Sequence, residues 1–297
     1  MPSNARVMDV PPVCRRYFAA QARKTSSPAA HSAQPEEKPH MTIELIVDKP
    51  IATVVINRPE RKNALTWEMR QQLTQYFTQL RFDDDIRAIV VTGGGGNFCS
   101  GADVTNMGGR DLRKARQMLQ SGSHAYIRML HNIEKPVIAA VEGVAVGIGM
   151  SIAMACDMMV VGATARFAQV FQRIGLAPDG GGIWFLSRRV GTPLAKELVF
   201  GGRFVGAEEA VKLGIANHMT PEGDALARAT EMARQFAEGP TYALGLSKKL
   251  FNISDGPSLE DYLEMESMVQ PQLNQTTDHA EGVTAFKEKR KPKFTGR

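Results

Sequence analysis

Residues 142–157 restrict the possible folds of this chain more than any other stretch. The apolar run Val137–Val141 leads into them and predicts a buried strand, and residues 150–156 predict a mostly apolar helix. Gly143, Gly147 and Gly149 lie between the two and permit a tight turn. Backbone N–H groups at such a turn lack partners and suit an anion, or an oxygen that gains negative charge in a reaction. The same residues also fit a buried crossover whose glycines only allow close packing.

Charge and cysteine content exclude several classes of protein. The net charge of +5 is concentrated at the ends, because residues 1–40 contribute +3 and residues 287–297 contribute +5, which leaves −3 for the rest. Such a body is a poor surface for nucleic acid. The three cysteines and six histidines show no metal-ligand spacing, and no apolar run is long enough to span a bilayer. We expect a protein of a reducing compartment, without a metal ion and without a membrane segment.

Residues 1–40 carry Pro, Ser and Ala without periodicity, and we expect them to be a disordered extension. Their basic residues, with one acid before Glu36, resemble an organelle transit peptide. The alternative is that Met41 is the true initiator. The first reading predicts an organelle matrix and the second a cytoplasmic protein.

The remaining chain predicts an α/β core followed by helices. Residues 42–47 and 51–56 predict a hairpin, Thr66 is expected to cap a helix to Arg81, and strands are expected at 87–92 and 158–161. A largely helical stretch over 105–134 and a helix from 178–182 to Val190 are also expected. From residue 192 onward the pattern is helical, at 192–200, 206–213, 224–238, 241–252, 258–269 and 278–290. We therefore predict a core over 41–223 and a helical region over 224–297.

Four segments resemble the crotonase (enoyl-CoA hydratase/isomerase) superfamily: residues 57–65, 98–103, 135–143 and 281–290. The resemblance covers residues 42–297 in the right order. It implies a spiral of ββα repeats with a helical C-terminal trimerisation region, and a homotrimer or a dimer of trimers. It also implies an acyl-CoA thioester as substrate, with coenzyme A as part of that substrate and no separate cofactor.

By the same resemblance, the backbone amides of Ala102 and Ile148 would hold the thioester carbonyl in an oxyanion hole. The family usually has Gly where Ile148 stands, and a backbone donor tolerates that change. The expected binding residues for the coenzyme A thioester are Arg61, Lys62, Ala64, Ala102, Asp103, Phe286 and Lys289. The last two would come from a neighbouring subunit. Asp103 and Asp157 are also expected to brace their turns, and Glu142 to be structural.

The chain departs from the family's hydratases at the acid and base positions. Those enzymes activate water with two glutamates, and the matching positions here are Ser151 and Phe171. Asp179 stands instead in a Pro-Asp-x-Gly-Gly turn, which resembles double-bond-shifting members such as the epoxyphenylacetyl-CoA isomerases. One carboxylate suffices to move a proton between two carbons, and an apolar pocket would raise its pKa. We therefore predict an enoyl-CoA isomerase with Asp179 as proton shuttle.

Several alternatives stay open at this point. Asp179 also suits a helix N-cap, which would leave a non-catalytic binder of CoA esters. A hydratase would need an acid that is not recognisable, and a dehalogenase-like use of Asp179 would need a histidine base, for which neither His124 nor His131 can be assigned. RNA binding is disfavoured, because the helix 67–81 holds only Arg70 and Arg81 as basic residues. The apolar residues that would either line the pocket or belong to the core are Met107, Met150, Phe171 and Trp184.

Overall fold

The computed structural model describes residues 42–105, 108 and 111–297. The predicted extension over 1–40 and the candidate pocket residue Met107 lie outside the described residues. Residues 41–297 form one compact unit. In the described part, no helix is both long and apolar enough to cross a membrane.

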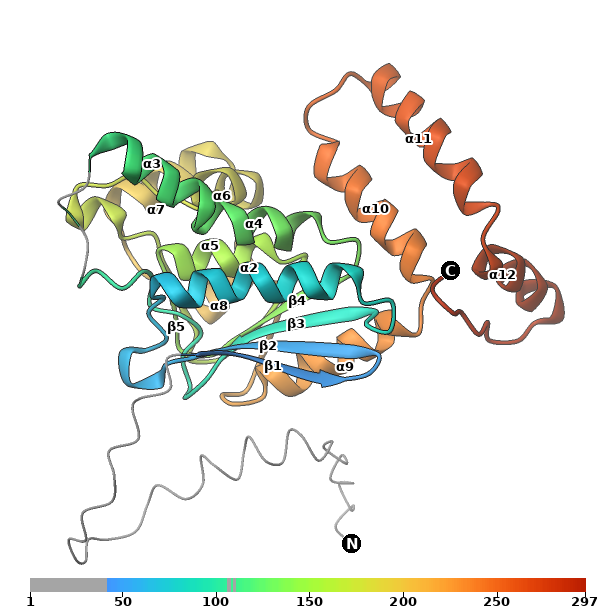
Figure 1. The fold of residues 1–297 in the computed structure, drawn as a ribbon, viewed down its shortest axis with the longest axis horizontal. Helices are drawn as coiled ribbons and strands as arrows, with labels where there is room; N and C mark the ends of the chain where they lie inside the picture. Colours follow the sequence, from blue (N-terminus) through green and yellow to red (C-terminus); the bar gives the residue numbers. More distant parts are fainter. Residues whose placement is uncertain (1–41, 106–107, 109–110) are drawn as a thin grey trace, which may run out of the picture. The chain divides into compact units, whose positions relative to one another are not determined.

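A six-stranded sheet with the strand order β1-β2-β3-β4-β6-β9 forms the centre of the fold (Figure 1). Its first pair is an antiparallel hairpin, and all other neighbours are parallel. A smaller three-stranded sheet has the order β5-β7-β8. The strand bounds are β1 (Thr42–Asp48), β2 (Ile51–Asn57), β3 (Ala88–Gly93), β4 (Val137–Val141), β5 (Val144–Val146), β6 (Met158–Gly162), β7 (Arg166–Ala168), β8 (Val205–Gly206) and β9 (His218–Thr220). This is the mixed α/β architecture that the sequence predicts.

The large sheet is buried on both faces. Successive side chains of each strand point to opposite sides, so each strand contributes to both hydrophobic clusters. On β3, Ile89 and Val91 belong to one hydrophobic cluster, whereas Ala88 and Val90 belong to the other. The helix α9 (Ala225–Ala237) covers the second face, and α2 (Trp67–Phe82), α4 (Ser123–Asn132) and α5 (Ile148–Ala155) lie on the first (Figure 1). Strands covered on both faces read as continuous apolar runs, which is why they were predictable.

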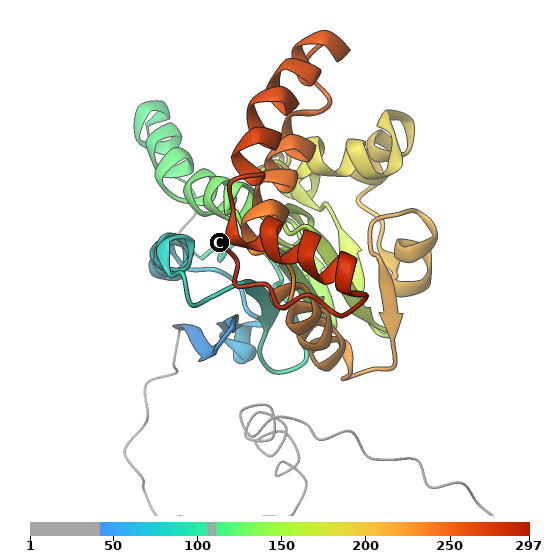
Figure 2. The same ribbon diagram turned by 90° about the vertical axis from the view of Figure 1, so that its right-hand side faces the viewer.

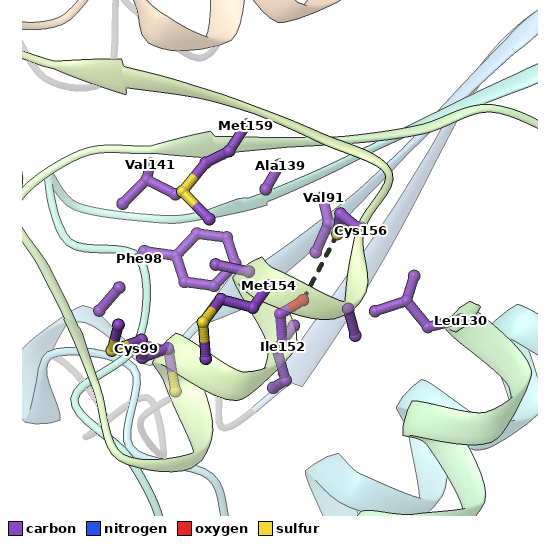
Figure 3. Packing of buried hydrophobic residues seen from close by; sticks show 14 of the residues in the cluster. Val91, Phe98, Cys99, Leu130, Ala139, Val141, Ile152, Met154, Cys156 and Met159 are labelled. Carbon is purple, nitrogen blue, oxygen red and sulfur yellow. Dashed lines mark hydrogen bonds between the residues drawn. The ribbon is translucent and has the colours of Figure 1, made fainter. Parts of the chain in front are cut away.

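The helix α5 lies in the middle of the first cluster. Figure 3 shows Ile152 and Met154 of α5 beside Val91 of β3, Ala139 of β4 and Met159 of β6. These side chains are at most 1% exposed, and each such burial stabilises the fold by roughly 1.5–3 kcal/mol. The Cys156 thiol closes the helix by donating to the Ile152 carbonyl at 3.5 Å. This packing fixes the helix whose first residue is Ile148.

The other helices lie close to their predicted positions. The predicted N-cap of α2 is confirmed, because the Thr66 hydroxyl accepts from the Met69 amide at 3.3 Å. The remaining bounds are η1 (Pro59–Arg61), α3 (Leu112–Ser121), η2 (Phe171–Ile174), α6 (Gly182–Val190), α7 (Thr192–Gly201), α8 (Ala207–Lys212), α10 (Thr241–Ile253), α11 (Leu259–Leu273) and α12 (Thr277–Glu288). The short strands β5, β7, β8 and β9 were not predicted.

The helical region after residue 223 has two parts. The helix α9 completes the core, whereas α10 and α11 form an antiparallel pair followed by α12 (Figures 1 and 2). The chain end is tied back to the core, because Arg87 donates to the Phe294 carbonyl at 3.1 Å and to the Thr241 hydroxyl at 2.8 Å. A trimerisation role for this region stays a prediction.

Candidate active site

Two glycine-containing turns lie side by side above the central sheet. Cys99 pairs in parallel with Ala145. The Cys99 amide donates to the Val144 carbonyl, and the Cys99 carbonyl accepts from the Val146 amide, both at 2.9 Å. The two segments stay in contact beyond this pair, because a Cβ atom at Gly101 would lie 3.3 Å from the Val146 carbonyl oxygen, next to the residues that precede Ile148. The sequence could identify each turn but not their convergence, which depends on this short parallel pairing.

Glycine is required where the two turns touch. A Cβ atom at Gly149 would lie 2.2 Å from the Cys99 carbonyl oxygen, so any side chain there would push the turns apart. Gly147 has φ 57° and ψ −123°, a backbone conformation that side chains with a Cβ disfavour. The glycines of this stretch therefore set the distance between the two turns.

The amides of Ala102 and Ile148 are available donors. Ile148 is the first residue of α5, so its N–H has no acceptor within the helix. On either side of Ala102, the Gly101 carbonyl and the Asp103 amide are bonded to Leu65 at 2.8 and 3.0 Å. Neither the Ala102 nor the Ile148 N–H donates to any group in the described part of the chain. Two free amides on adjoining turns can stabilise an oxygen that becomes negatively charged.

Asp179 lies in the turn that precedes α6, next to the Ile148 side chain. A Cβ atom at the adjacent Gly180 would lie 2.1 Å from Ile148 Cδ1. The backbone carbonyl of Asp179 accepts from the Gly182 amide and from the Ser151 hydroxyl, each at 3.0 Å. The N-cap of α6 is Gly181, and no side chain caps this helix. The capping interpretation of Asp179 is therefore wrong.

The Asp179 carboxyl group has no hydrogen-bonding partner for its buried oxygen Oδ1 within residues 42–105, 108 and 111–297. Burial raises the pKa of this carboxyl, and the charges of Arg70 and His124 and a hydrogen bond from its own amide offset only part of that effect. A poorly solvated carboxylate is a stronger base than one in water. The rise in pKa that the sequence predicts therefore comes from burial.

A cleft of about 960 Å³ opens beside Asp179. It is lined from the loop before α2 by Arg58 and Arg61, from α2 by Glu68 and Arg70, and from η2 by Phe171. Such a volume is typical of a site for a large organic ligand.

Three carboxylates line this cleft, and their environments differ. Hydrogen bonds from Thr105 and a 2.6 Å ion pair with Arg58 hold the pKa of Asp103 well below its usual range. Hydrogen bonds from the Glu68 amide and the Thr66 hydroxyl lower the pKa of the Glu68 carboxyl. Only Asp179 has a raised pKa. Among these three, it alone is largely buried and keeps one oxygen without a hydrogen-bonding partner, as a general base requires.

Comparison with known proteins identifies the family. The sequence model for enoyl-CoA hydratase/isomerase matches residues 47–297. The chain belongs to the enoyl-CoA hydratase/isomerase family. It is 35% identical to 1,2-epoxyphenylacetyl-CoA isomerase of Escherichia coli over 254 residues, which cover 84% of this chain and 97% of the relative. It is 37% identical to a probable enoyl-CoA hydratase of Rhodobacter capsulatus over 256 residues, covering 86% and 98% of the two chains.

Solved structures of the family share the fold. The crystal structure of a putative enoyl-CoA hydratase from Streptomyces coelicolor A3(2) superposes with a TM-score of 0.83 at 34% identity, covering 92% of this chain and all of that one. An enoyl-CoA hydratase from Polaromonas sp. JS666 gives 0.81 at 32% identity, covering 85% and 99% of the two chains. The crotonase fold predicted from the sequence is confirmed.

The loop that the family resemblance assigns to coenzyme A has a defined shape. Lys62 and Asn63 have φ angles of 48° and 61°, which few side chains adopt. Asn63 is fully buried, and three hydrogen bonds of its side chain stabilise this conformation. Its oxygen accepts from the Arg58 amide at 2.7 Å, and its amide nitrogen donates to the carbonyls of Gly94 and Asn97 at 2.8 and 2.6 Å. The Ala64 carbonyl accepts from Arg58 at 3.0 Å. Sequence reasoning did not identify Asn63 as the residue that shapes this family loop.

The structure separates Phe286 and Lys289 from the cleft of the same chain. The first turn of α2 lines the cleft. The end of the chain is bonded to Arg87, which follows the last turn of α2, at the other end of that helix (Figure 1). Phe286 is 85% exposed, and Lys289 ends α12 with φ 55°. These family positions would need a second subunit in order to reach a bound ligand.

The apolar candidates are distributed differently from the expectation. Phe171 lines the cleft, whereas Met150 is 2% exposed and belongs to the core. Trp184 does not line it and packs instead against His131, with Arg188 Cζ 3.7 Å from its ring centroid. Trp184 therefore fits neither of the two alternatives, since it does not line this cleft and is 40% exposed rather than part of the core.

The acidic residues assigned to structural roles have structural partners. Glu142 accepts from the amides of Gly223 and Ala225 at 3.1 Å and so caps α9. Asp157 accepts from the Val137 amide at 2.8 Å and pairs with Lys248 at 3.0 Å. Neither lines the cleft.

Proposed function

We propose that the protein is an enoyl-CoA isomerase that moves a double bond within an acyl-CoA thioester, with Asp179 as the proton shuttle. The observation that carries this proposal is the buried, unpartnered Oδ1 of Asp179 in the cleft beside Ile148. The two positions that hold glutamates in the family's hydratases are Ser151 and Phe171.

The reaction needs one base and one oxyanion site. The amides of Ala102 and Ile148 hold the thioester carbonyl oxygen. Asp179 removes a proton from C2 of a 3-enoyl thioester, and the electron pair of the broken C–H bond forms a dienolate whose charge rests on that oxygen. The carboxylic acid then returns the same proton to C4, and the double bond lies between C2 and C3. The carboxylate is regenerated and no other reactant is consumed.

Hydration of a 2-enoyl thioester is the second candidate, and the R. capsulatus relative is named a probable hydratase. Adding water requires one group that deprotonates it and another that protonates the α-carbon. Ser151 is fully buried, and its hydroxyl donates to the backbone carbonyl of Asp179, so it is not free to activate water. Phe171 has no ionisable group. These residues favour isomerisation.

We further assign the coenzyme A part of the substrate to the loop residues Arg61, Lys62 and Ala64 and to Ala102 and Asp103. Phe286 and Lys289 would complete the site from a neighbouring subunit in a homotrimer or a dimer of trimers. The cytoplasm is the expected location, or an organelle matrix if residues 1–40 act as a transit peptide.

The test compares wild type with Asp179→Asn on 3-hexenoyl-CoA and 2-hexenoyl-CoA, followed by the absorbance of the conjugated thioester. We expect wild type to form the conjugated product and the variant to lose about 100-fold or more in kcat, as for the loss of a general base. Glu68→Gln, which removes another carboxylate of the same cleft, serves as the control. Wild type that only hydrates, or an active Asp179→Asn variant, would refute the proposal.

A further inference from the structure

We propose that Arg70 selects acyl groups that carry a hydrogen-bond-accepting oxygen beyond the thioester, so that the substrate is an oxygenated acyl-CoA. This inference names the substrate class of the site described above and rests on the proposed function for the orientation of the acyl chain.

Arg70 is a half-buried cation without a partner. It lies in the second turn of α2, lines the cleft, and has its Nε atom buried. In the described part of the chain, its guanidinium makes no hydrogen bond and has no carboxylate oxygen within 4.0 Å. Removing a charge from water without compensation is unfavourable, so a partner from the ligand would stabilise it.

Other shielded arginines of this protein do have partners. Arg58 pairs with Asp103 at 2.6 Å, and Arg189 donates to the carbonyls of Ile215 and Met154 at 2.9 and 2.7 Å. Their guanidinium groups hold the structure together. Arg70 has no such role: its Nε is buried without a partner, and the residue lines the cleft.

The surroundings of Arg70 place it at the acyl part of the site. Its positive charge reaches Asp179, Tyr126 and Cys99, where it opposes the rise in pKa that burial causes. Cys99 belongs to one oxyanion turn, and Asp179 is the base. The thioester oxygen already has the two amide donors, and the coenzyme A part is assigned to the loop at 61–64, so we assign the acceptor for Arg70 to the acyl chain.

The hydroxyls of Ser123 and Tyr126, on the neighbouring helix α4, are buried and do not line the cleft. Ser123 is a hydrogen-bonding neighbour of Tyr126. Arg70 is therefore the unpaired donor that a ligand in the cleft meets. A plain hydrocarbon chain would leave its guanidinium unsatisfied, whereas an oxygen substituent would accept from it.

Two kinds of oxygen can accept hydrogen bonds from Arg70: an ionised carboxylate and a neutral hydroxyl or ether oxygen. The affinities of saturated thioesters, which are not turned over, distinguish the two. Isothermal titration calorimetry would compare an acyl-CoA, its ω-hydroxyacyl-CoA and its ω-carboxyacyl-CoA at equal carbon number, for chains of four to eight carbons. We expect wild type to bind at least one oxygenated thioester about tenfold or more tightly than the plain one, as for charge-assisted hydrogen bonds.

The variant Arg70→Met should lose this preference while binding plain thioesters as wild type does. Arg61→Met is the matched control, since it removes another arginine of the same cleft and should weaken all three ligand classes equally. Equal binding of all three classes by wild type would overturn the proposal, whatever the variants do. A uniform loss in Arg70→Met would overturn it too. Since no proton is transferred, the outcome is independent of whether Asp179 proves to be the base.

Discussion

At the scale of single residues, the proposed base Asp179 carries a penalty in stability. Burial raises the pKa of its carboxyl in the folded protein, so folding favours the protonated form. The folded state therefore binds the proton over a pH range in which the unfolded chain has released it. Folding stability falls as the pH rises through this range, and the ionised carboxylate above it destabilises the fold. The proposed role predicts the opposite dependence for activity, because only the carboxylate can accept a proton.

We therefore expect Asp179→Asn to be inactive and more stable than wild type at pH 8. The amide keeps the shape of the side chain but carries no charge to desolvate. Thermal unfolding from pH 8 to pH 4 would show a difference in Tm that shrinks as the pH falls, since wild type then becomes neutral at this position. A variant that is less stable than wild type at pH 8 would contradict the account.

The sequence indicated Asp179 and Arg70 to different degrees. Asp179 could be proposed as the base from the family resemblance, because of its Pro-Asp-x-Gly-Gly turn and the missing glutamates at 151 and 171. Arg70 was noticed only as a basic residue of the helix 67–81. Its helical spacing from Leu73 and Phe77, three and seven residues later and both fully buried, was the available signal that it faces inward. That Arg70 lacks a partner depends on the tertiary structure and could not be predicted.

At the scale of elements, the site depends on the contact between the turn at 99–102 and the start of α5. The helix was predictable from its apolar run. The strands β5, β7, β8 and β9 contain two or three residues each, too few for a periodic pattern, and were missed. Since β5 sets the register with Cys99, the convergence of the two amides could be inferred only from the family resemblance.

Gly149→Ala tests this contact. The added methyl group would meet the Cys99 carbonyl oxygen at 2.2 Å, so the turns must separate and the two amides no longer address one oxygen. We expect kcat to fall by about 100- to 1000-fold, the range for losing an oxyanion donor, and stability to fall by about 1–3 kcal/mol from overpacking.

The control for this variant is Gly201→Ala at the end of α7, where an added Cβ has no atom within 4 Å. It should leave both kcat and Tm close to wild type. Steady-state kinetics and thermal unfolding check both variants. Full activity in Gly149→Ala would show that the spacing of the turns does not matter.

At the scale of the whole molecule, the described chain shows an apolar surface on its C-terminal helices. Phe251, Leu259 and Phe286 are 78%, 69% and 85% exposed. The assembly expected from the family resemblance would cover them and bring Lys289 to a neighbour's cleft.

A mixing experiment tests whether Lys289 acts across subunits. Assemblies that combine Asp179→Asn chains with Lys289→Glu chains should be more active than either variant alone, because some clefts then receive an intact base and an intact lysine from different chains. Turnover at low substrate concentration measures the gain.

The matched control combines Asp179→Asn with Arg61→Glu, whose positions line the same cleft of one chain. No mixture of these two can assemble an intact site, so no gain is expected. Equal behaviour of the two mixtures would place Lys289 outside the neighbouring site.

Ser151 restricts which other side chains position 151 can accommodate while Asp179 keeps its place. It is fully buried, supports the Asp179 turn through its hydroxyl, and would lie only 2.9 Å from a Cβ atom at Gly182. A glutamate at 151, which the family resemblance gives for the hydratases, would be longer than this packed serine and would press on the turn that carries Asp179. Converting one arrangement of carboxylates into the other would therefore call for changes in both segments rather than a single substitution.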